Sequence, residues 1–185
     1  MEVVLVRHGE TEWSRDGRHT GRTDVPLTER GEEQARAVGR ALHGRSFALV
    51  LSSPLQRALE TARLAGFSPE VREELAEWDY GSYEGRTTAE IREEVPGWTI
   101  WGYGAPDGES AEQVGARADR VVAELRGVDG DALLFAHGHL LRVLTARWLL
   151  LPPADGRLFA LESGTIGTLG YEREQAVIDS WNVPV

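Results

Sequence analysis

The stretch from Glu2 to Thr11 reads EVVLVRHGET, a short apolar run that leads into an arginine, a histidine and a glycine. Val3 to Val6 is apolar without interruption and rich in β-branched residues, the pattern of a strand covered on both faces. Such strands are typical of the centre of a parallel sheet. The stretch therefore predicts a central strand with Arg7 and His8 at its carboxyl end.

Two further apolar runs, Phe47 to Leu51 and Ala132 to Ala136, predict buried strands of the same kind. Helical spacing of apolar residues appears between and after them, in segments 28–44, 53–62, 110–127 and 140–150. Segments 165–172 and 176–180 predict a hairpin at the sheet edge. The alternation predicts an α/β fold, a three-layer αβα sandwich whose mostly parallel sheet has helices on both faces.

Local signals set the expected helix starts. Thr28 is the expected cap of the first helix, and residues 53–56 and 110–113 both have the capping-box pattern, the former with Pro54 in the first helical position. Segment 73–107 is irregular and rich in Trp, Tyr, Gly and acids, with a short helix expected over 88–95 before Pro96. We interpret this segment as an insertion over the functional site.

Composition narrows the class of protein. The 185 residues are 41% hydrophobic, enough for a single domain over 1–185, and the net charge of -10 argues against nucleic-acid or anionic-membrane partners. The absence of cysteine excludes disulfides and thiolate chemistry. No basic leader or run of about 20 apolar residues occurs, so we expect a cytoplasmic protein. Whether it forms a homo-oligomer stays open.

Charged and titratable residues follow three of the expected strands. Arg7 and His8 follow the first, Arg57 lies in the helix after the second, and His137 follows the third. Ligands of open α/β sheets bind beyond the carboxyl ends of the strands, so these side chains should converge. Two arginines and two histidines in one crevice predict a phosphate pocket.

His137 and His139 raise an alternative, because alternate residues of an extended segment face the same way and could both ligate a metal. No third His or Cys lies nearby to complete a closed site. We therefore expect neither a metal nor a cofactor.

The chain resembles the histidine phosphatase superfamily, also called phosphoglycerate mutase-like. The resemblance rests on blocks in the family's order: Arg7 to Thr11, Thr20-Gly21 with Asp24 to Thr28, Ser52 to Ala58, Glu77 to Gly85, Gly108 to Ser110, and His137 to His139. It is similar in particular to a subgroup that contains sedoheptulose-1,7-bisphosphatase and acid phosphatases from actinobacteria.

The resemblance implies that His8 is a nucleophile that becomes phosphorylated, with Arg7, Arg57 and His137 stabilising the phosphoryl charge in place of a metal. It also implies that Glu77 is the general acid, although Glu73, Glu74, Asp79 and Glu84 are close enough in sequence to compete. A carboxyl beside a phosphate dianion and several aromatic rings should have a raised pKa, so we expect an acidic activity optimum.

Family members divide between mutases and phosphatases. The short distance along the chain from Glu77 to His137 leaves no room for the long segment of full-length cofactor-dependent mutases, which favours hydrolysis. The expected activity is that of an acid phosphatase acting on a small sugar phosphate or bisphosphate. A phosphoglycerate mutase and a non-catalytic phospho-ligand-binding module are the alternatives.

The resemblance also suggests residues that bind the substrate. Ser14 stands where many family members have an Asn that helps to bind the phosphate, which puts that contact in doubt. Arg142 is a candidate to bind a second phosphate, with a surface arginine as the alternative. The remaining candidates for the pocket wall are His19, Thr20, Gly21 and Trp101.

Overall fold

The computed structural model describes the whole chain, residues 1–185, and contains a six-stranded sheet. The strands are β1 Val3–Arg7, β2 Leu49–Ser52, β3 Glu70–Val71, β4 Ala132–Ala136, β5 Ile166–Glu172 and β6 Gln175–Val183, in the order β3-β2-β4-β1-β5-β6. β1 runs parallel to β4 and antiparallel to β5, and β2 runs parallel to β3 and β4. The predicted central strand, mostly parallel sheet and edge hairpin are confirmed.

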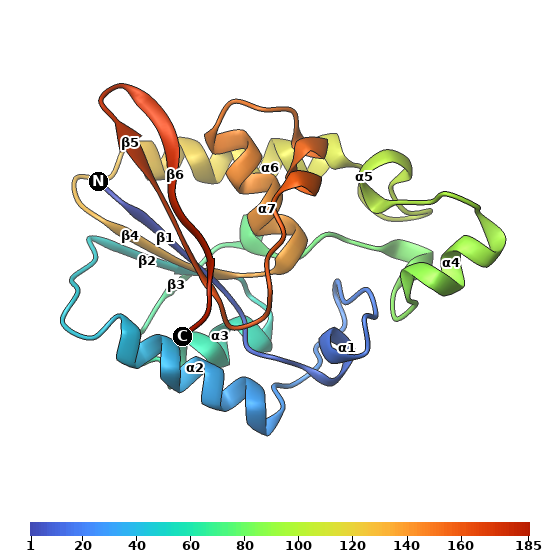
Figure 1. Ribbon diagram of the computed structural model, residues 1–185, viewed down its shortest axis with the longest axis horizontal. Helices are drawn as coiled ribbons and strands as arrows, with labels where there is room; N and C mark the ends of the chain where they lie inside the picture. Colours follow the sequence, from blue (N-terminus) through green and yellow to red (C-terminus); the bar gives the residue numbers. More distant parts are fainter.

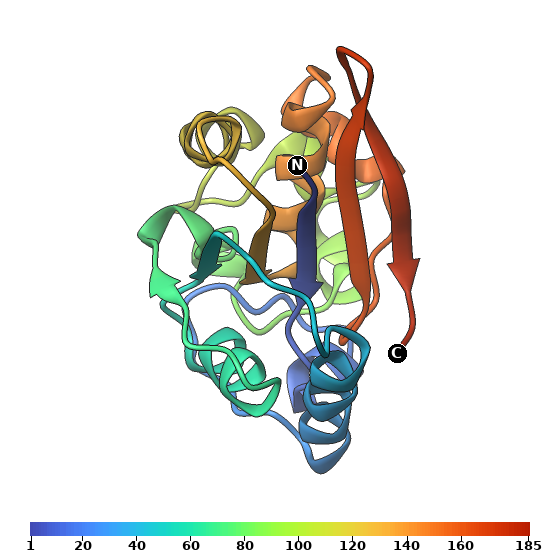
Figure 2. The ribbon, with the colours of Figure 1, turned by 90° about the vertical axis from the view of Figure 1, so that its left-hand side faces the viewer.

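Helices cover both faces of this sheet (Figures 1 and 2). α2 and α3 lie on one side, and α6 and α7 lie on the other. The α-helices are α1 Glu12–Arg15, α2 Glu29–Ala41, α3 Gln56–Leu64, α4 Thr88–Glu94, α5 Ile100–Tyr103, α6 Ala111–Arg126 and α7 Gly138–Trp148. Short 3-10 helices are η1 Glu73–Leu75, η2 Gly81–Tyr83 and η3 Pro153–Leu158. The predicted three-layer αβα sandwich is confirmed.

The two faces of β1 serve two different hydrophobic clusters. Val3 and Leu5 belong to the larger cluster, which includes α6 and α7, whereas Val4 and Val6 belong to the smaller one against α2 and α3. Alternate strand residues point to opposite faces, so the apolar run is explained by burial on both sides. This burial fixes the register of β1 and with it the place where Arg7 and His8 leave the sheet.

The predicted helix caps are only partly correct. Thr28 caps α2 and Ser110 forms the expected capping box of α6. The predicted capping box at Ser53 is wrong, because α3 begins at Gln56 after Leu55 and has no side-chain cap, and Pro54 therefore precedes the helix instead of starting it. The Ser53 hydroxyl instead accepts a hydrogen bond from Leu55 N and contacts His137, so it serves the carboxyl edge of the sheet.

The irregular segment between β3 and α6 extends to one side of the molecule, where it carries α4 and α5 (Figure 1). Trp78 and Trp98 of this segment are almost fully buried. Main-chain bonds join it to the loop after α1, from His19 N to Arg86 O and from Gly85 N to His19 O. The two loops together build a wall beyond the carboxyl ends of the strands.

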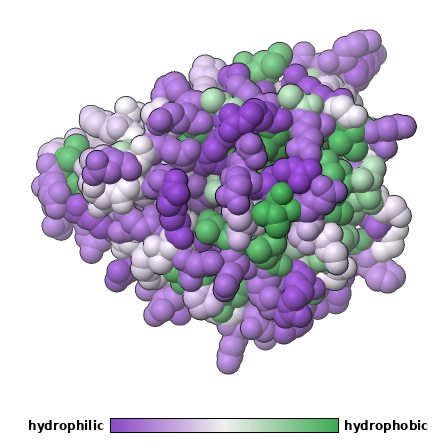
Figure 3. Space-filling view, turned by 180° about the vertical axis from the view of Figure 1, so that it is seen from behind, coloured by the Kyte–Doolittle hydropathy of each residue, from purple (hydrophilic) through white to green (hydrophobic).

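The outer surface is mainly polar. Hydrophilic side chains cover most of the face seen from behind, with apolar side chains in smaller groups between them (Figure 3). None of the helices has the length and apolar character needed to cross a membrane.

Candidate active site

The parallel pairing of β1 with β4 brings the predicted histidines together. Arg7 lies in register with Ala136, and His8 N donates to Ala136 O at 3.0 Å. The rings of His8 and His137 are therefore neighbours, with centroids 5.1 Å apart. Arg57 reaches the same place from the first turn of α3 and donates from Nε to His137 Nδ1 at 3.1 Å.

His8 is held in one tautomer. Its Nδ1 lies 2.7 Å from the carbonyl oxygen of Gly9, which can only accept, so Nδ1 carries the proton and Nε2 keeps its lone pair. Burial, followed by the charges of Arg57 and Arg7, lowers the pKa of His8 well below 6.5. A neutral imidazole with a free Nε2 is a competent nucleophile.

The turn after His8 requires glycine. A Cβ on Gly9 would lie 2.2 Å from the carbonyl oxygen of Gly31 in the first turn of α2. Gly9 N in turn donates to the Thr61 hydroxyl of α3. The carbonyl that orients His8 is thereby fixed between the two helices on that side of the sheet.

Arg7 presents an unused donor. Its Nη1 donates to Leu161 O, but its Nε is buried and is the one buried side-chain polar atom of the chain without a hydrogen bond. Buried polar groups are nearly always paired, so an unpaired arginine donor beside His8 fits a site that receives an anion. Gly138 lies against this guanidinium, where a Cβ would be 3.3 Å from Nε.

Arg57 and His137 lie behind the cavity wall. Arg57 donates to the carbonyl oxygens of Thr20, Gly21 and Thr23 as well as to His137, and so holds the loop after α1. Because His137 Nδ1 accepts from Arg57, its proton is on Nε2, 2.7 Å from Ser53 Oγ. Burial and the charge of Arg57 lower the His137 pKa well below 6.5. His137 is therefore a neutral ring that donates from Nε2.

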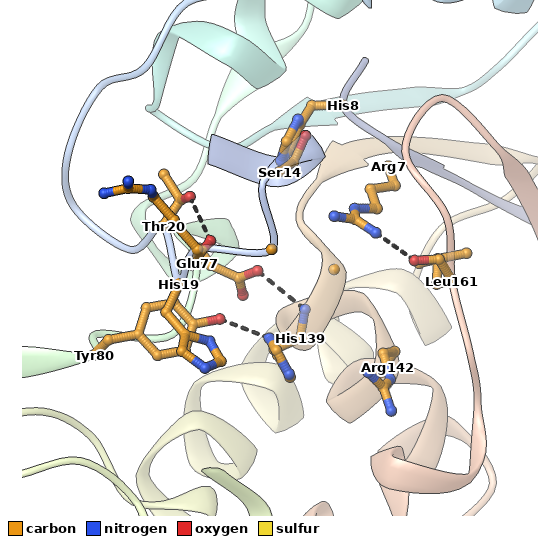
Figure 4. Close-up of a pocket in the computed structure, with 13 residues that line it drawn as sticks. Arg7, His8, Ser14, His19, Thr20, Glu77, Tyr80, His139, Arg142 and Leu161 are labelled. Carbon is orange, nitrogen blue, oxygen red and sulfur yellow. Dashed lines mark hydrogen bonds between the residues drawn. The ribbon is translucent and has the colours of Figure 1, made fainter. Parts of the chain in front are cut away.

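Glu77 binds the N-terminus of α7. Its carboxylate accepts from His139 N at 3.0 Å (Figure 4) and from Leu140 N and Trp78 N, both at 2.9 Å. Backbone N–H groups at a helix start are natural partners of a carboxylate. Glu77 is only 7% exposed, and it is the one acid that lines the cavity beside His8.

The competing acids have other partners. Glu84 accepts from Gly21 N and Thr23 N, and Asp79 accepts from Gly81 N and from Arg22 Nε. Glu73 and Glu74 line a separate groove on the other side of Glu77. The geometry therefore favours Glu77 among the five acids considered from the sequence.

The cavity itself encloses about 180 Å³ between His8 and the outer loops (Figure 4). Ser14, His19, Thr20 and Arg142 line it, as expected for substrate-binding residues. Burial lowers the pKa of His19 to about 4, so this side chain is a neutral part of the wall.

Two candidates for the wall do not reach it. Gly21 lies outside the cavity lining and contributes its carbonyl oxygen to Arg57. Trp101 lies behind the wall, with its ring 4.6 Å from the Arg142 guanidinium and 5.1 Å from the His139 ring. Trp101 therefore supports two lining residues rather than facing a ligand.

Several lining residues were not among the candidates. Tyr80 places its hydroxyl 2.6 Å from His139 Nδ1, and both side chains face the cavity beside Arg18. The position of His139 could have been predicted, because it lies between an expected strand end at His137 and the expected start of the next helix. Nothing in the sequence pattern indicates the contribution of Leu161, which comes from the loop before β5.

The alternative of a metal-binding pair is not supported by the geometry. His137 is extended, but α7 begins at Gly138, so His139 is helical and the two histidines do not alternate along one extended segment; their rings also bind different partners. No group of three or more His, Cys, Asp or Glu side chains is placed to hold a metal ion.

A neutral histidine with a free Nε2, a buried arginine donor and a nearby carboxyl, at the carboxyl edge of a parallel sheet, define an enzyme of phosphoryl transfer through histidine. The comparison with known families agrees with this class. The chain belongs to the histidine phosphatase superfamily, whose branch 1 model matches residues 3–184.

Relatives and solved structures agree with this membership. An acid phosphatase of Mycobacterium tuberculosis is 47% identical over 184 residues, 95% of this chain and 91% of that protein. A sedoheptulose 1,7-bisphosphatase of Saccharomyces cerevisiae is 36% identical, covering 78% of this chain and 66% of that protein. A probable phosphoglycerate mutase of an Enterobacter species is 31% identical, covering 99% and 91%. A solved structure from Mycobacterium tuberculosis has a TM-score of 0.95 and 44% identity, covering 99% and 97%.

The predicted family, subgroup and fold class are thus confirmed, and the chain is a phosphatase of this superfamily. A relative named as a probable mutase aligns with 99% of this chain and 91% of its own length, so the short distance from Glu77 to His137 is a weaker argument against mutase activity than the sequence suggested. The roles of individual residues stay predictions.

Proposed function

We propose that the protein hydrolyses small phosphomonoesters, sugar phosphates in particular, through a phosphohistidine at Nε2 of His8. The observation that carries the proposal is the free Nε2 of His8 beside the unpaired Nε of Arg7 in a cavity with a single acid, Glu77. The reaction needs a nucleophile, a stabiliser of negative charge and a proton donor, and these three groups supply them.

In the first step Nε2 of His8 attacks phosphorus and a P–N bond forms. The P–O bond to the leaving group breaks with its electron pair on oxygen, and Glu77 gives that oxygen a proton. Arg7 stabilises the charge on the equatorial oxygens. Arg57 holds the loop after α1 and His137 holds the carboxyl edge of the sheet, and both thereby support the site in which Arg7 and His8 act. The product is phosphohistidine and the free alcohol.

In the second step water attacks the phosphorus, and the Glu77 carboxylate takes its proton. The P–N bond breaks with its electron pair on Nε2, which restores neutral His8 and releases inorganic phosphate. One acid thus serves as proton donor in the first half of the reaction and as base in the second.

The pH dependence of this reaction should favour mildly acidic conditions. His8 must be neutral to attack, and its lowered pKa keeps it neutral as the pH falls below 6.5, while Glu77 must carry a proton in the first step. We expect kcat/KM measured against pH on a sugar phosphate to peak below pH 7, with the acid limb below the ordinary range of histidine. A maximum well into the alkaline range would contradict the assignment of these roles.

The outer cavity supports a substrate with a second anionic group. Arg142 donates from Nε to Gly156 O and from Nη2 to Arg157 O, and its Cζ lies 4.6 Å from the centre of the Trp101 ring. These contacts fix the guanidinium in the wall and leave Nη1 without a partner in the chain. A free charged donor held rigidly in this way fits a second phosphate.

Replacement of Arg142 tests this part of the proposal. Arg142→Ala should lower kcat/KM for a sugar bisphosphate about ten- to a hundred-fold, the worth of a charge-assisted hydrogen bond, and should change the value for the monophosphate much less. Arg157→Ala is the control, since Arg157 is exposed and lies outside the cavity. Equal losses on both substrates would remove the second-phosphate role from Arg142.

The proposal as a whole is tested by phosphate release in EDTA from sedoheptulose 1,7-bisphosphate, fructose 1,6-bisphosphate, 3-phosphoglycerate and 4-nitrophenyl phosphate. Fast release from a sugar phosphate supports it. A mutase would instead move phosphoryl groups between positions of 3-phosphoglycerate with added bisphosphoglycerate and release little phosphate. A binding module would bind phosphate without turnover. The expectation of a cytoplasmic protein without nucleic-acid partners stays a prediction.

A further inference from the structure

The segment that carries Glu77 has little regular structure of its own. Glu77 lies between η1 and η2, and its side chain reaches across to α7. Three N–H donors fix the carboxylate group, but they do not fix the main chain from which it extends. Placing an acid against a leaving group needs both ends of the side chain to be held.

Arg117 of α6 supplies this support. Its Nη1 donates to Glu74 O at 2.8 Å and Ala76 O at 2.6 Å, and its Nη2 donates to Glu77 O at 3.1 Å. The residue as a whole is only 9% exposed. A single guanidinium thus holds three carbonyl oxygens of the segment, including that of Glu77 itself.

Glu109 completes the arrangement. Arg117 donates to both carboxylate oxygens of Glu109 at 2.9 Å, so all five of its N–H groups have acceptors. Glu109 also accepts from Asp79 N through Oε2 and from the Trp78 indole through its carbonyl oxygen, and its own N donates to Asp79 O. The pair therefore holds the chain on both sides of Glu77.

From this geometry we infer that Arg117, with Glu109, is the positioning residue of Glu77, holding its main chain so that the carboxyl reaches the leaving-group oxygen. The inference rests on the proposed function, in which Glu77 is the general acid. Arg117 lies outside the cavity lining and so acts through Glu77 rather than on the substrate.

The test compares two leaving groups. Arg117→Lys keeps the positive charge, but lysine has only three N–H donors and cannot replace the five hydrogen bonds that Arg117 donates. We expect kcat/KM for an alkyl phosphate, whose leaving oxygen needs a proton, to fall roughly ten- to a hundred-fold. The value for 4-nitrophenyl phosphate, whose leaving group needs little protonation, should fall only a few-fold. Arg120→Lys is the matched control, because Arg120 is exposed on the same helix and bonds the Glu74 side chain without touching these carbonyls.

Glu109→Gln is the second variant, used if Arg117→Lys does not fold, and it should show the same dependence on the leaving group. Combined with Glu77→Gln, neither change should cause a further loss, because residues that act as a unit are not additive. An equal fall in kcat/KM on both substrates would show that Arg117 has a purely structural role. A fully additive loss when either variant is combined with Glu77→Gln would show the same. If Glu77→Gln alone lacks the leaving-group dependence, the assignment of the acid has failed instead.

Discussion

Replacing His8 by alanine should lower kcat on every phosphomonoester by a factor on the order of 10⁴ to 10⁶, the usual cost of removing a nucleophile. The reason is that the Gly9 carbonyl fixes the Nε2 lone pair of His8 beside Arg7, whereas Nε2 of His19 in the cavity wall is hydrogen-bonded to Thr88. His137 presents a proton rather than a lone pair on the side away from Arg57, and His139 Nδ1 is bonded to Tyr80. The measurement is phosphate release from a sugar phosphate and from 4-nitrophenyl phosphate.

The control for this loss is His43→Ala. His43 is exposed just beyond the C-terminal end of α2, whereas the opposite end of this helix contacts Gly9 beside the site, so its removal should leave kcat unchanged. A thermal melt of both variants separates loss of chemistry from loss of folding. Substantial turnover by folded His8→Ala would mean that another group attacks phosphorus.

Replacing Glu77 by glutamine should produce the second largest effect. Loss of the general acid should reduce kcat/KM for alkyl phosphates about 10²- to 10⁴-fold, with a much smaller loss for 4-nitrophenyl phosphate. Glutamine retains one oxygen for Trp78 N and Leu140 N but leaves His139 N without its acceptor. A stability loss of about 1 kcal/mol should accompany the change.

Glu73→Gln is the matched control for this variant, because Glu73 is an exposed acid of the same segment that lies outside the cavity. Glu73→Gln should leave kcat/KM unchanged for both the alkyl phosphate and 4-nitrophenyl phosphate. If Glu77→Gln lowers kcat/KM equally for the aryl and the alkyl phosphates, the acid is another group.

The sequence predicts the fold well wherever one local pattern has one physical cause. The apolar run of β1 is buried by helices on both faces, and its parallel pairing with β4 explains why Arg7, His8 and His137 meet. The failure at Ser53 has an equally local cause. The pattern of a helix cap cannot show that the hydroxyl is engaged by His137, whose strand lies far away in the chain.

The site is predicted less completely, because its outer parts depend on tertiary contacts. Trp101 was expected in the wall and lies behind Arg142 and His139. Arg117 occupies a helix position that a periodic pattern assigns to a polar surface, yet it is buried against the chain around Glu77. Only the path of the irregular segment reveals such a contact, and that path has no sequence period.

The most direct test of the central claim is to trap the intermediate on Glu77→Gln. With 4-nitrophenyl phosphate the first step needs little acid, whereas water activation needs the missing carboxylate, so phosphoryl enzyme should accumulate with one equivalent of 4-nitrophenol released in a burst. Alkaline quenching and mass spectrometry of the peptides, with wild type beside the variant, should place a single phosphoryl group on His8. A phosphoryl group on another residue, or none on either protein during turnover, would contradict the proposed route through His8.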